Sequence, residues 1–153
     1  MVDLLEPTKV TWVLVIIGLI IYAFPLYMQI LAVRNPHSQK VKDLLIGKGE
    51  DYVDRTHFLF CYGTGWADLI MQFPPLIIGS IGVLLGRSWG YLLWMAVASI
   101  AIYISIVLWF VDREYVYPKC GPLAFYTYYW GIWVYWSVAV SAYCLLRFNG
   151  VVF

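Results

Sequence analysis

Residues 10–33 form an uninterrupted run of 24 residues without a charged side chain. At a helical rise of about 1.5 Å per residue, such a run is longer than the roughly 30 Å hydrocarbon core of a bilayer. The run therefore predicts a transmembrane helix. Asp3 and Glu6 precede it, where a cleavable signal peptide would carry basic residues, so we expect this helix to remain in the mature protein.

Three more apolar segments follow, over about residues 57–86, 88–111 and 121–147. The first of these carries one carboxylate, Asp68, and a Pro74–Pro75 pair that we expect to kink the helix. The pattern predicts an all-α integral membrane protein, a four-transmembrane-helix bundle with an internal cavity. We expect a single domain over residues 1–153.

The longest polar connection, residues 34–56, contains an apolar patch at Leu44, Leu45 and Ile46. We therefore expect it to fold as a cap on the bundle. By the positive-inside rule, the side of the membrane that holds this loop should be cytoplasmic, because more Lys and Arg flank the spans there than on the side of the termini. The seven positions are Arg34, Lys40, Lys42, Lys48, Arg55, Arg113 and Lys119.

Composition excludes several classes of function. Only 12% of the residues are charged, about half the share in soluble domains. A net charge of +1 without a basic block argues against a nucleic-acid partner. Three widely spaced cysteines, Cys61, Cys120 and Cys144, predict neither a disulfide framework nor a zinc site. Motifs for hydrolysis and phosphoryl transfer are lacking, and we expect no metal and no cofactor.

Asp68 is the strongest candidate for a functional residue. A carboxylate at the centre of a transmembrane helix costs about 2.5–3.5 kcal/mol, so it needs a partner, a water-filled cavity or a bound proton. The functional interpretation is an acid that faces a cavity, and the structural alternative is a hydrogen bond to Tyr or Trp of a neighbouring helix. Helical spacing places all the polar side chains of this span on one face: His57, Cys61, Thr64, Asp68 and Gln72.

The fourth span is rich in aromatic residues. A subset at helical spacing predicts a wall of rings, which is either ordinary packing or the side of an apolar pocket whose ring faces attract a cation. An acid opposite such a wall suits an amine ligand, or a carbocation made by protonating an alkene. The subset comprises Phe125, Tyr129, Trp133, Trp136, Val140 and Tyr143.

We therefore predict Asp68 as the catalytic residue, with a set of substrate-binding residues around it. His57 has a structural alternative, because a histidine at a helix start often belongs to a helix interface. In the first span the only features are Tyr22, Pro25, Tyr27 and Gln29, and Pro25 should kink the helix or free a carbonyl toward the cavity. The predicted substrate-binding residues are Trp136, Trp133, Tyr129, Gln72, Thr64, Tyr103, Gln29 and His57.

Several local patterns resemble the EXPERA domain family, which includes the emopamil-binding protein, a sterol isomerase, and the sigma-two receptor. Residues 68–74 (DLIMQFP) are similar to an acid followed by Gln and a helix-breaking proline in the second span of the receptor. Residues 109–114 and 121–123, before the aromatic run, look like the matching connection of the isomerase. Trp136 falls at the position where the last helix of the isomerase has a functional tryptophan. Pro25 resembles a first-span proline of the receptor.

The resemblance covers about residues 11–147 and implies a four-helix bundle in the endoplasmic reticulum or a related membrane, with a cavity that admits sterol-like molecules and amphiphilic amines. It also implies cytoplasmic termini, opposite to the charge count. In the isomerase a His–Glu pair of the first span shares the proton transfer with the second-span acid. The present first span has neither, and Trp133 occupies the position of a fourth-span Asn. A second base must then come from water, His57, a tyrosine or the substrate.

Three hypotheses follow. The first is an isomerase or cyclase that protonates a hydrophobic sterol- or isoprenoid-like substrate through Asp68. The second is a non-catalytic protein that binds sterols, lipids or amphiphilic amines. The third is an accessory subunit of a larger membrane complex, with the aromatic face as its partner surface. The expected partners are a hydrophobic small molecule and membrane lipids, and a homodimer stays open.

Overall fold

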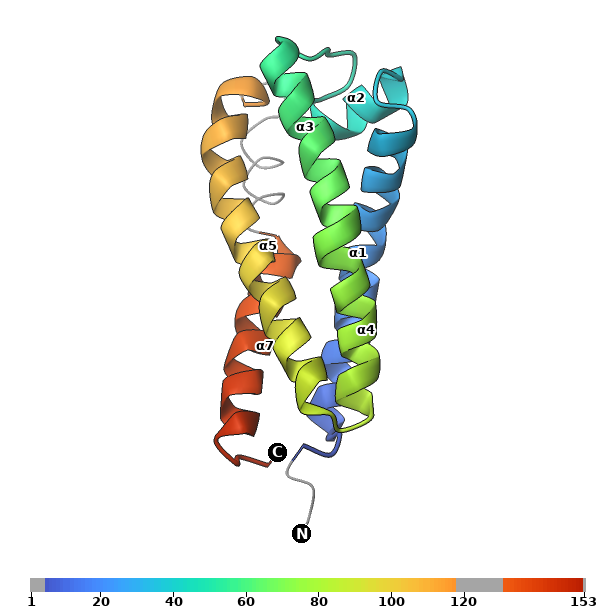
Figure 1. The fold of residues 1–153 in the computed structure, drawn as a ribbon. Helices are drawn as coiled ribbons and strands as arrows, with labels where there is room; N and C mark the ends of the chain where they lie inside the picture. The colour runs from blue at the N-terminus through green and yellow to red at the C-terminus, as the bar shows by residue number, and fades with distance from the viewer. Residues whose placement is uncertain (1–4, 118–130, 153) are drawn as a thin grey trace.

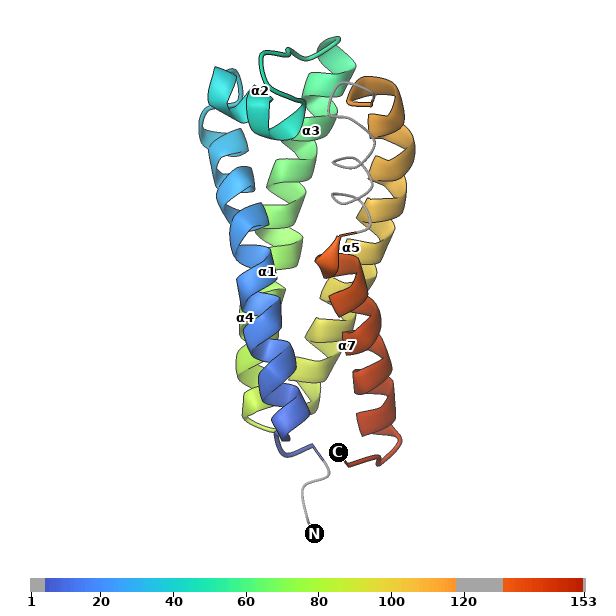
Figure 2. The same cartoon turned by 180° about the vertical axis from the view of Figure 1, so that it is seen from behind.

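The computed structural model describes residues 5–117 and 131–152, and every regular element in these ranges is helical. The helices run lengthwise beside one another (Figures 1 and 2). Their order is α1 (Lys9–Arg34), α2 (Gln39–Leu45), α3 (Arg55–Ala67), the π-helical turn η1 (Asp68–Gln72), α4 (Phe73–Leu84), α5 (Ser88–Tyr115) and α7 (Ile132–Phe148).

Three of these helical segments are long and apolar enough to cross a membrane, namely Lys9–Arg34, Arg55–Leu84 and Ser88–Tyr115. The shorter apolar helix α7 covers the second part of the predicted fourth span, whose first part lies outside the described residues. The start of α1 and the end of α7 lie at the same end of the molecule (Figure 1). Helix length and composition thus support a membrane protein.

Helix α1 begins with a capping box in which Thr8 and Thr11 satisfy each other's backbone amides. Both hydroxyls also contact the Tyr143 hydroxyl of α7, and the Thr8 oxygen lies 3.0 Å from it. The helix continues through Pro25 to Arg34. Pro25 has no amide hydrogen for the Ile21 carbonyl, so the expected loss of one backbone hydrogen bond occurs without ending the helix.

Helices α4 and α5 form a tight hairpin because glycines let their backbones touch. Gly86 has φ +66° in the turn, a conformation that favours glycine. A Cβ atom at Gly90 would lie only 2.4 Å from the carbonyl carbon of Gly82. Trp89 covers Gly82 in the same way, at 2.5 Å from its missing Cβ. Any larger side chain would force the two helices apart.

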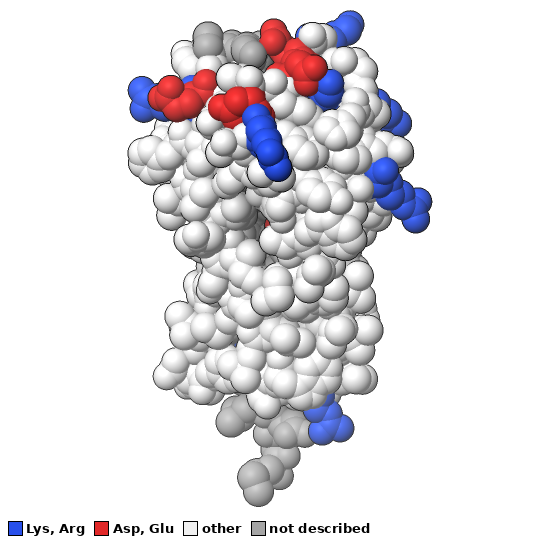
Figure 3. All heavy atoms as spheres, turned by 45° about the horizontal axis from the view of Figure 1, so that its top comes forward, with Lys and Arg blue, Asp and Glu red and all other residues white. Residues whose placement is uncertain are grey.

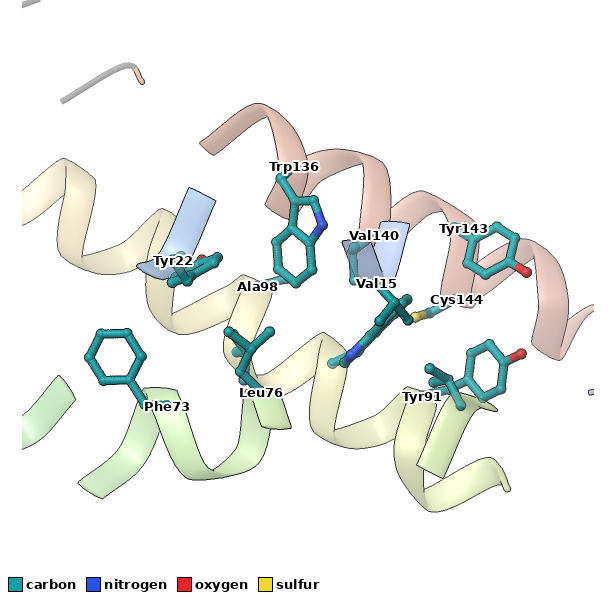
Figure 4. Packing of buried hydrophobic residues seen from close by; sticks show 14 residues of the cluster. Val15, Tyr22, Phe73, Leu76, Tyr91, Ala98, Trp136, Val140, Tyr143 and Cys144 are labelled. Atoms are coloured by element: carbon teal, nitrogen blue, oxygen red, sulfur yellow. The ribbon is translucent and has the colours of Figure 1, made fainter. Parts of the chain in front are cut away.

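The core lies between α1, α4, α5 and α7 and contains large aromatic residues (Figure 4). Trp136 packs edge-on against Tyr22 and Trp94. Its indole nitrogen donates to the Leu14 carbonyl at 2.8 Å, and that of Trp94 donates to Ser80 Oγ at 3.1 Å. Each buried indole thus has the hydrogen-bond partner that it needs away from water.

The connection between α1 and α3 is folded, as the apolar patch within it predicts. The Ser38 side chain caps the N-terminus of α2. Val41 within α2 and Ile46 directly after it are buried. Lys42 Nζ forms a 2.8 Å ion pair with Asp51. The Tyr52 hydroxyl donates to the Pro36 carbonyl at 3.0 Å, and burial raises the pKa of Tyr52 to about 12.

Charged side chains gather around this folded connection, whereas the middle of the molecule presents an uncharged surface with a hollow in it (Figure 3). Away from the charged ends of the long helical segments, many large apolar side chains are exposed, for example Ile20 on α1, Ile70 on η1 and Leu92 on α5. An apolar belt of this kind matches the lipid-facing surface of a membrane protein.

Candidate functional site

Asp68 is the first residue of a single π-helical turn in the middle of the second long helical segment. Pro74 and Pro75 follow it and lack amide hydrogens, and their rings crowd the carbonyls four residues earlier. The backbone accommodates them by widening, so that the Phe73 amide bonds to the Asp68 carbonyl five residues back. The predicted kink is thus a π-turn, a feature that frequently marks functional sites.

A neighbouring helix supplies a partner for the acid. Nε2 of Gln29 on α1 donates a hydrogen bond to Oδ2 of Asp68 at 2.9 Å. Gly65, one turn before Asp68, makes the approach possible, because a Cβ atom there would lie 3.1 Å from Gln29 Oε1. Asp68 thus has a hydrogen-bond partner on a neighbouring helix, but this partner is an amide and not the tyrosine or tryptophan of the structural alternative.

The Gln29 bond leaves half of the carboxyl group available. Within the described part of the chain, Oδ1 of Asp68 has no hydrogen-bond partner. Asp68 is half-buried, whereas Gln29 is only 8% exposed. One oxygen is thus held in place by an oriented donor, and the other is free to meet a ligand.

Asp68 lines a small pocket of about 70 Å³ between α1, α3, η1, α5 and α7. A water molecule occupies about 30 Å³ in the liquid, so the pocket has room for a few waters or one small chemical group. The wall is apolar apart from a few hydrogen-bonding side chains. Its lining comprises Tyr22, Phe24, Pro25, Gln29, Thr64, Asp68, Gln72, Ala101, Ile104, Ser105, Leu108 and Trp133.

Tyr22 brings a second functional group to this pocket. It is 4% exposed, and its hydroxyl makes no hydrogen bond of good geometry among the described residues, although the side chains of Ser137 and Gln72 are near enough to interact with it. Burying a hydroxyl whose hydrogen bonds are incomplete is unfavourable by up to about 1–3 kcal/mol. Such a group within a pocket beside an acid is a candidate hydrogen-bond donor to a bound molecule or water.

A second, larger hollow opens on the other side of Asp68. This groove of about 550 Å³ runs along the outer surface between α3–η1 and α5. Asp68, Thr64 and Ile104 line both the groove and the pocket. Its other lining residues are Leu59, Phe60, Gly63, Ala67, Met71, Ile100 and Tyr103.

The structure brings most of the predicted site residues together. Thr64, Gln72, Gln29 and Trp133 line the pocket with Asp68. Tyr103 lies in the groove and is 66% exposed. Asp68 and Gln72, the first and last residues of the π-turn, both line the pocket.

Other predicted residues lie elsewhere. Trp136 is a core residue, held by its bond to the Leu14 carbonyl, and is not part of the pocket lining. His57 is fully buried near the folded connection, with its ring stacked on Tyr115 at 4.4 Å, which fits the interface alternative. Tyr129 lies outside the described residues.

The predicted wall of rings on the fourth span contains both core residues and a pocket residue. Val140 and Tyr143 belong to the core with Trp136, so this part of the wall serves packing. Trp133 alone among its described members faces the pocket. The packing alternative therefore applies to most of the wall that the structure describes.

Tyr22 is one of the few polar residues of the first span, but it is not among the predicted site residues. Its position relative to Pro25 and Gln29 was the available signal, because residues three and seven apart share one face of a helix. The three residues indeed line one pocket. A tyrosine at this spacing is also common in ordinary packing, which is why the pattern alone does not identify it.

Chemically, the site offers a carboxyl group with one free oxygen, a tyrosine hydroxyl and the ring of Trp133. Among the described residues, His, Cys, Asp and Glu form no group of three able to hold a metal ion. Comparison of the chain with protein-family models, curated proteins and solved structures finds no match.

Proposed function

We propose that this chain is a multi-pass membrane enzyme that isomerises or cyclises a hydrophobic sterol- or isoprenoid-like molecule by proton transfer from Asp68. The observation that carries the proposal is the Gln29–Asp68 hydrogen bond at the edge of a pocket. It orients the carboxyl group and leaves Oδ1 open, as a proton donor to an alkene requires. We further propose that the four apolar segments form a four-helix bundle around this pocket, in the endoplasmic reticulum.

In the proposed reaction, the O–H bond of the protonated Asp68 breaks and its proton adds to one carbon of an alkene. The positive charge that develops on the other carbon is stabilised by the ring face of Trp133. A neighbouring carbon then loses a proton to the Asp68 carboxylate or to a water beside Tyr22, and a shifted alkene forms. No atom is gained or lost, so the product has the mass of the substrate.

The experiment compares wild type and Asp68→Asn, purified in lipid nanodiscs and incubated with sterols and with cyclic and epoxidised isoprenoids. Products are identified by mass spectrometry and chromatographic retention. We expect a product of unchanged mass that Asp68→Asn abolishes. Asp43→Asn is the matched control, because Asp43 lies in the folded connection away from the pocket, and it should retain turnover.

Tyr22→Phe tests the second group. Removal of the hydroxyl should lower kcat at least tenfold and leave KM nearly unchanged if Tyr22 acts on the proton that leaves the cation. An unchanged kcat would exclude that role for Tyr22 and leave it to water or to the Asp68 carboxylate.

A second candidate function is binding without catalysis. The Gln29 amide favours this function, because an N–H group that donates to Oδ2 also stabilises the ionised carboxylate of Asp68. A carboxylate at this position pairs with the ammonium group of an amphiphilic amine. If no compound turns over but amines or sterols bind in an Asp68-dependent way, the protein is a binding protein and the proposed enzymatic function is wrong.

A further inference from the structure

We infer that the ligand of Asp68 lies mainly in the lipid-facing groove between α3 and α5, which it enters sideways from the bilayer. The inference rests on the proposed function, since it names where the body of that hydrophobic molecule binds. It commits to a ligand with a long or polycyclic hydrocarbon body, whose reacting or polar end alone reaches the acid.

The volumes of the pocket and the groove indicate which of them can hold the body of the ligand. Pockets for drug-sized molecules have about 300–1,000 Å³. The interior pocket has about 70 Å³, so a polycyclic body does not fit inside it. The groove has about 550 Å³. The small pocket then serves the reacting group and a few waters, and the groove serves the hydrocarbon body.

The groove is continuous with the site. Asp68 and Thr64 line both hollows from the α3 side, and Ile104 lines both from α5. A molecule in the groove therefore touches the carboxyl group without passing through the packed core. Asp68 also lies near the middle of its 30-residue segment, at the depth of the acyl chains.

The chemistry of the groove matches a hydrocarbon. Apart from Asp68 and Thr64 at the pocket end, Tyr103 carries the only other hydroxyl or charged group among its lining side chains. Leu59, Met71 and Tyr103 are each more than half exposed, at 51%, 57% and 66%. They face the region that lipid occupies, so a hydrocarbon body replaces acyl chains there without desolvating polar groups.

Gly63 offers a direct test. It lines the groove, and a Cβ atom there meets no other atom within 4 Å. Gly63→Trp thus fills the groove without a clash at its Cβ atom. Ile20→Trp is the matched control, since Ile20 is 67% exposed on α1 and lines neither hollow.

The first readout is turnover, or retention of a radiolabelled sterol, in lipid nanodiscs. We expect Gly63→Trp to reduce it at least tenfold and Ile20→Trp to leave it unchanged, with equal thermal stability of both variants. If Gly63→Trp equals wild type while Asp68→Asn loses all signal, the groove inference is overturned and the proposed function stands. If Asp68→Asn also equals wild type, both fail.

The second readout is photocrosslinking with a sterol that carries a diazirine on its ring system, applied to wild type and Asp68→Asn. We expect labelled peptides from residues 59–71 and 100–104. Labels confined to α1 and α7 would place the ligand inside the helical assembly and overturn the inference. This readout does not depend on turnover, so it separates the position of the ligand from the chemistry.

Discussion

Gln29 lies directly against Gly65, because a Cβ atom at residue 65 would come within 3.1 Å of Gln29 Oε1. The same Gln29 side chain orients Asp68 through its other amide atom. Gly65, which has no side chain, therefore makes room for the Gln29 amide that sets the position of the Asp68 carboxyl group. Helices α1 and α3 can bring the Gln29 amide and the Asp68 carboxyl group together only because α3 has a glycine at this contact.

Gly65→Ala should therefore weaken the site before it weakens the fold. The added methyl group displaces the Gln29 amide, whose hydrogen bond contributes about 0.5–1.5 kcal/mol when Asp68 is protonated and about 1.5–3 kcal/mol when it is ionised. Turnover or amine binding should fall about tenfold or more, as it should in Gln29→Leu. Gly63→Ala, whose new methyl group meets no atom within 4 Å, controls only for the effect of a methyl group in α3 on unfolding, because Gly63 lines the groove. Full activity of Gly65→Ala would contradict the arrangement.

Gly90→Ala should strongly destabilise the α4–α5 hairpin. Its Cβ atom would lie 2.4 Å from backbone atoms of Gly82 and Val83, which cannot move aside as a flexible side chain can. Overpacking of this kind lowers the free energy of unfolding by about 3 kcal/mol. Unfolding by SDS in mixed micelles, followed by circular dichroism, measures the change, and a loss below that of an exposed Ile78→Ala would contradict the close contact.

Trp136→Ala should cost far more stability than Trp12→Ala. Trp136 is 3% exposed, and its ring packs against Tyr22 and Trp94. Its removal leaves a cavity, and truncation of a buried tryptophan lowers the free energy of unfolding by about 3–5 kcal/mol. Trp12 is 51% exposed. Equal losses in the same SDS titration would show that Trp136 is not the core residue described above.

Acidification should loosen the folded connection between α1 and α3. A hydrogen bond from Gln39 and another from the Gly49 amide hold the pKa of Asp43 below its usual value of 3.8. A lowered folded-state pKa means that the stabilisation is complete above about pH 3.8 and is lost as the pH falls through the lower value. The Gly49 amide resonance reports this titration by NMR.

The expected midpoint of the Gly49 titration lies below 3.8, and Asp43→Asn should remove it. A midpoint at or above 3.8 would mean that the two hydrogen bonds do not favour the ionised form in solution. Asp51, which Lys42 stabilises as an ion pair, should titrate below its usual pKa as well.

The sequence alone determines the helical class and the helical segments of this protein. Apolar runs that are longer than a bilayer core and carry at most one charge identify the regions of α1, α3–α4 and α5, because lipid leaves the backbone no partner outside its own helix. Asp68 is identified in the same way, since an acid in such a run is costly and requires a reason. The apolar patch of residues 44–46 likewise indicates the folded connection.

Tertiary structure decided which side chains meet. Tyr22 and Gln29 lie on α1, whereas Asp68 follows Gln29 by 39 residues, and only the approach of α1 to α3 at Gly65 brings the three to one pocket. Trp133 and Trp136 look equivalent in the sequence, yet one lines that pocket and the other fills the core. Periodicity specifies a face of a helix but not the neighbour it contacts, because that contact depends on how two helices approach each other.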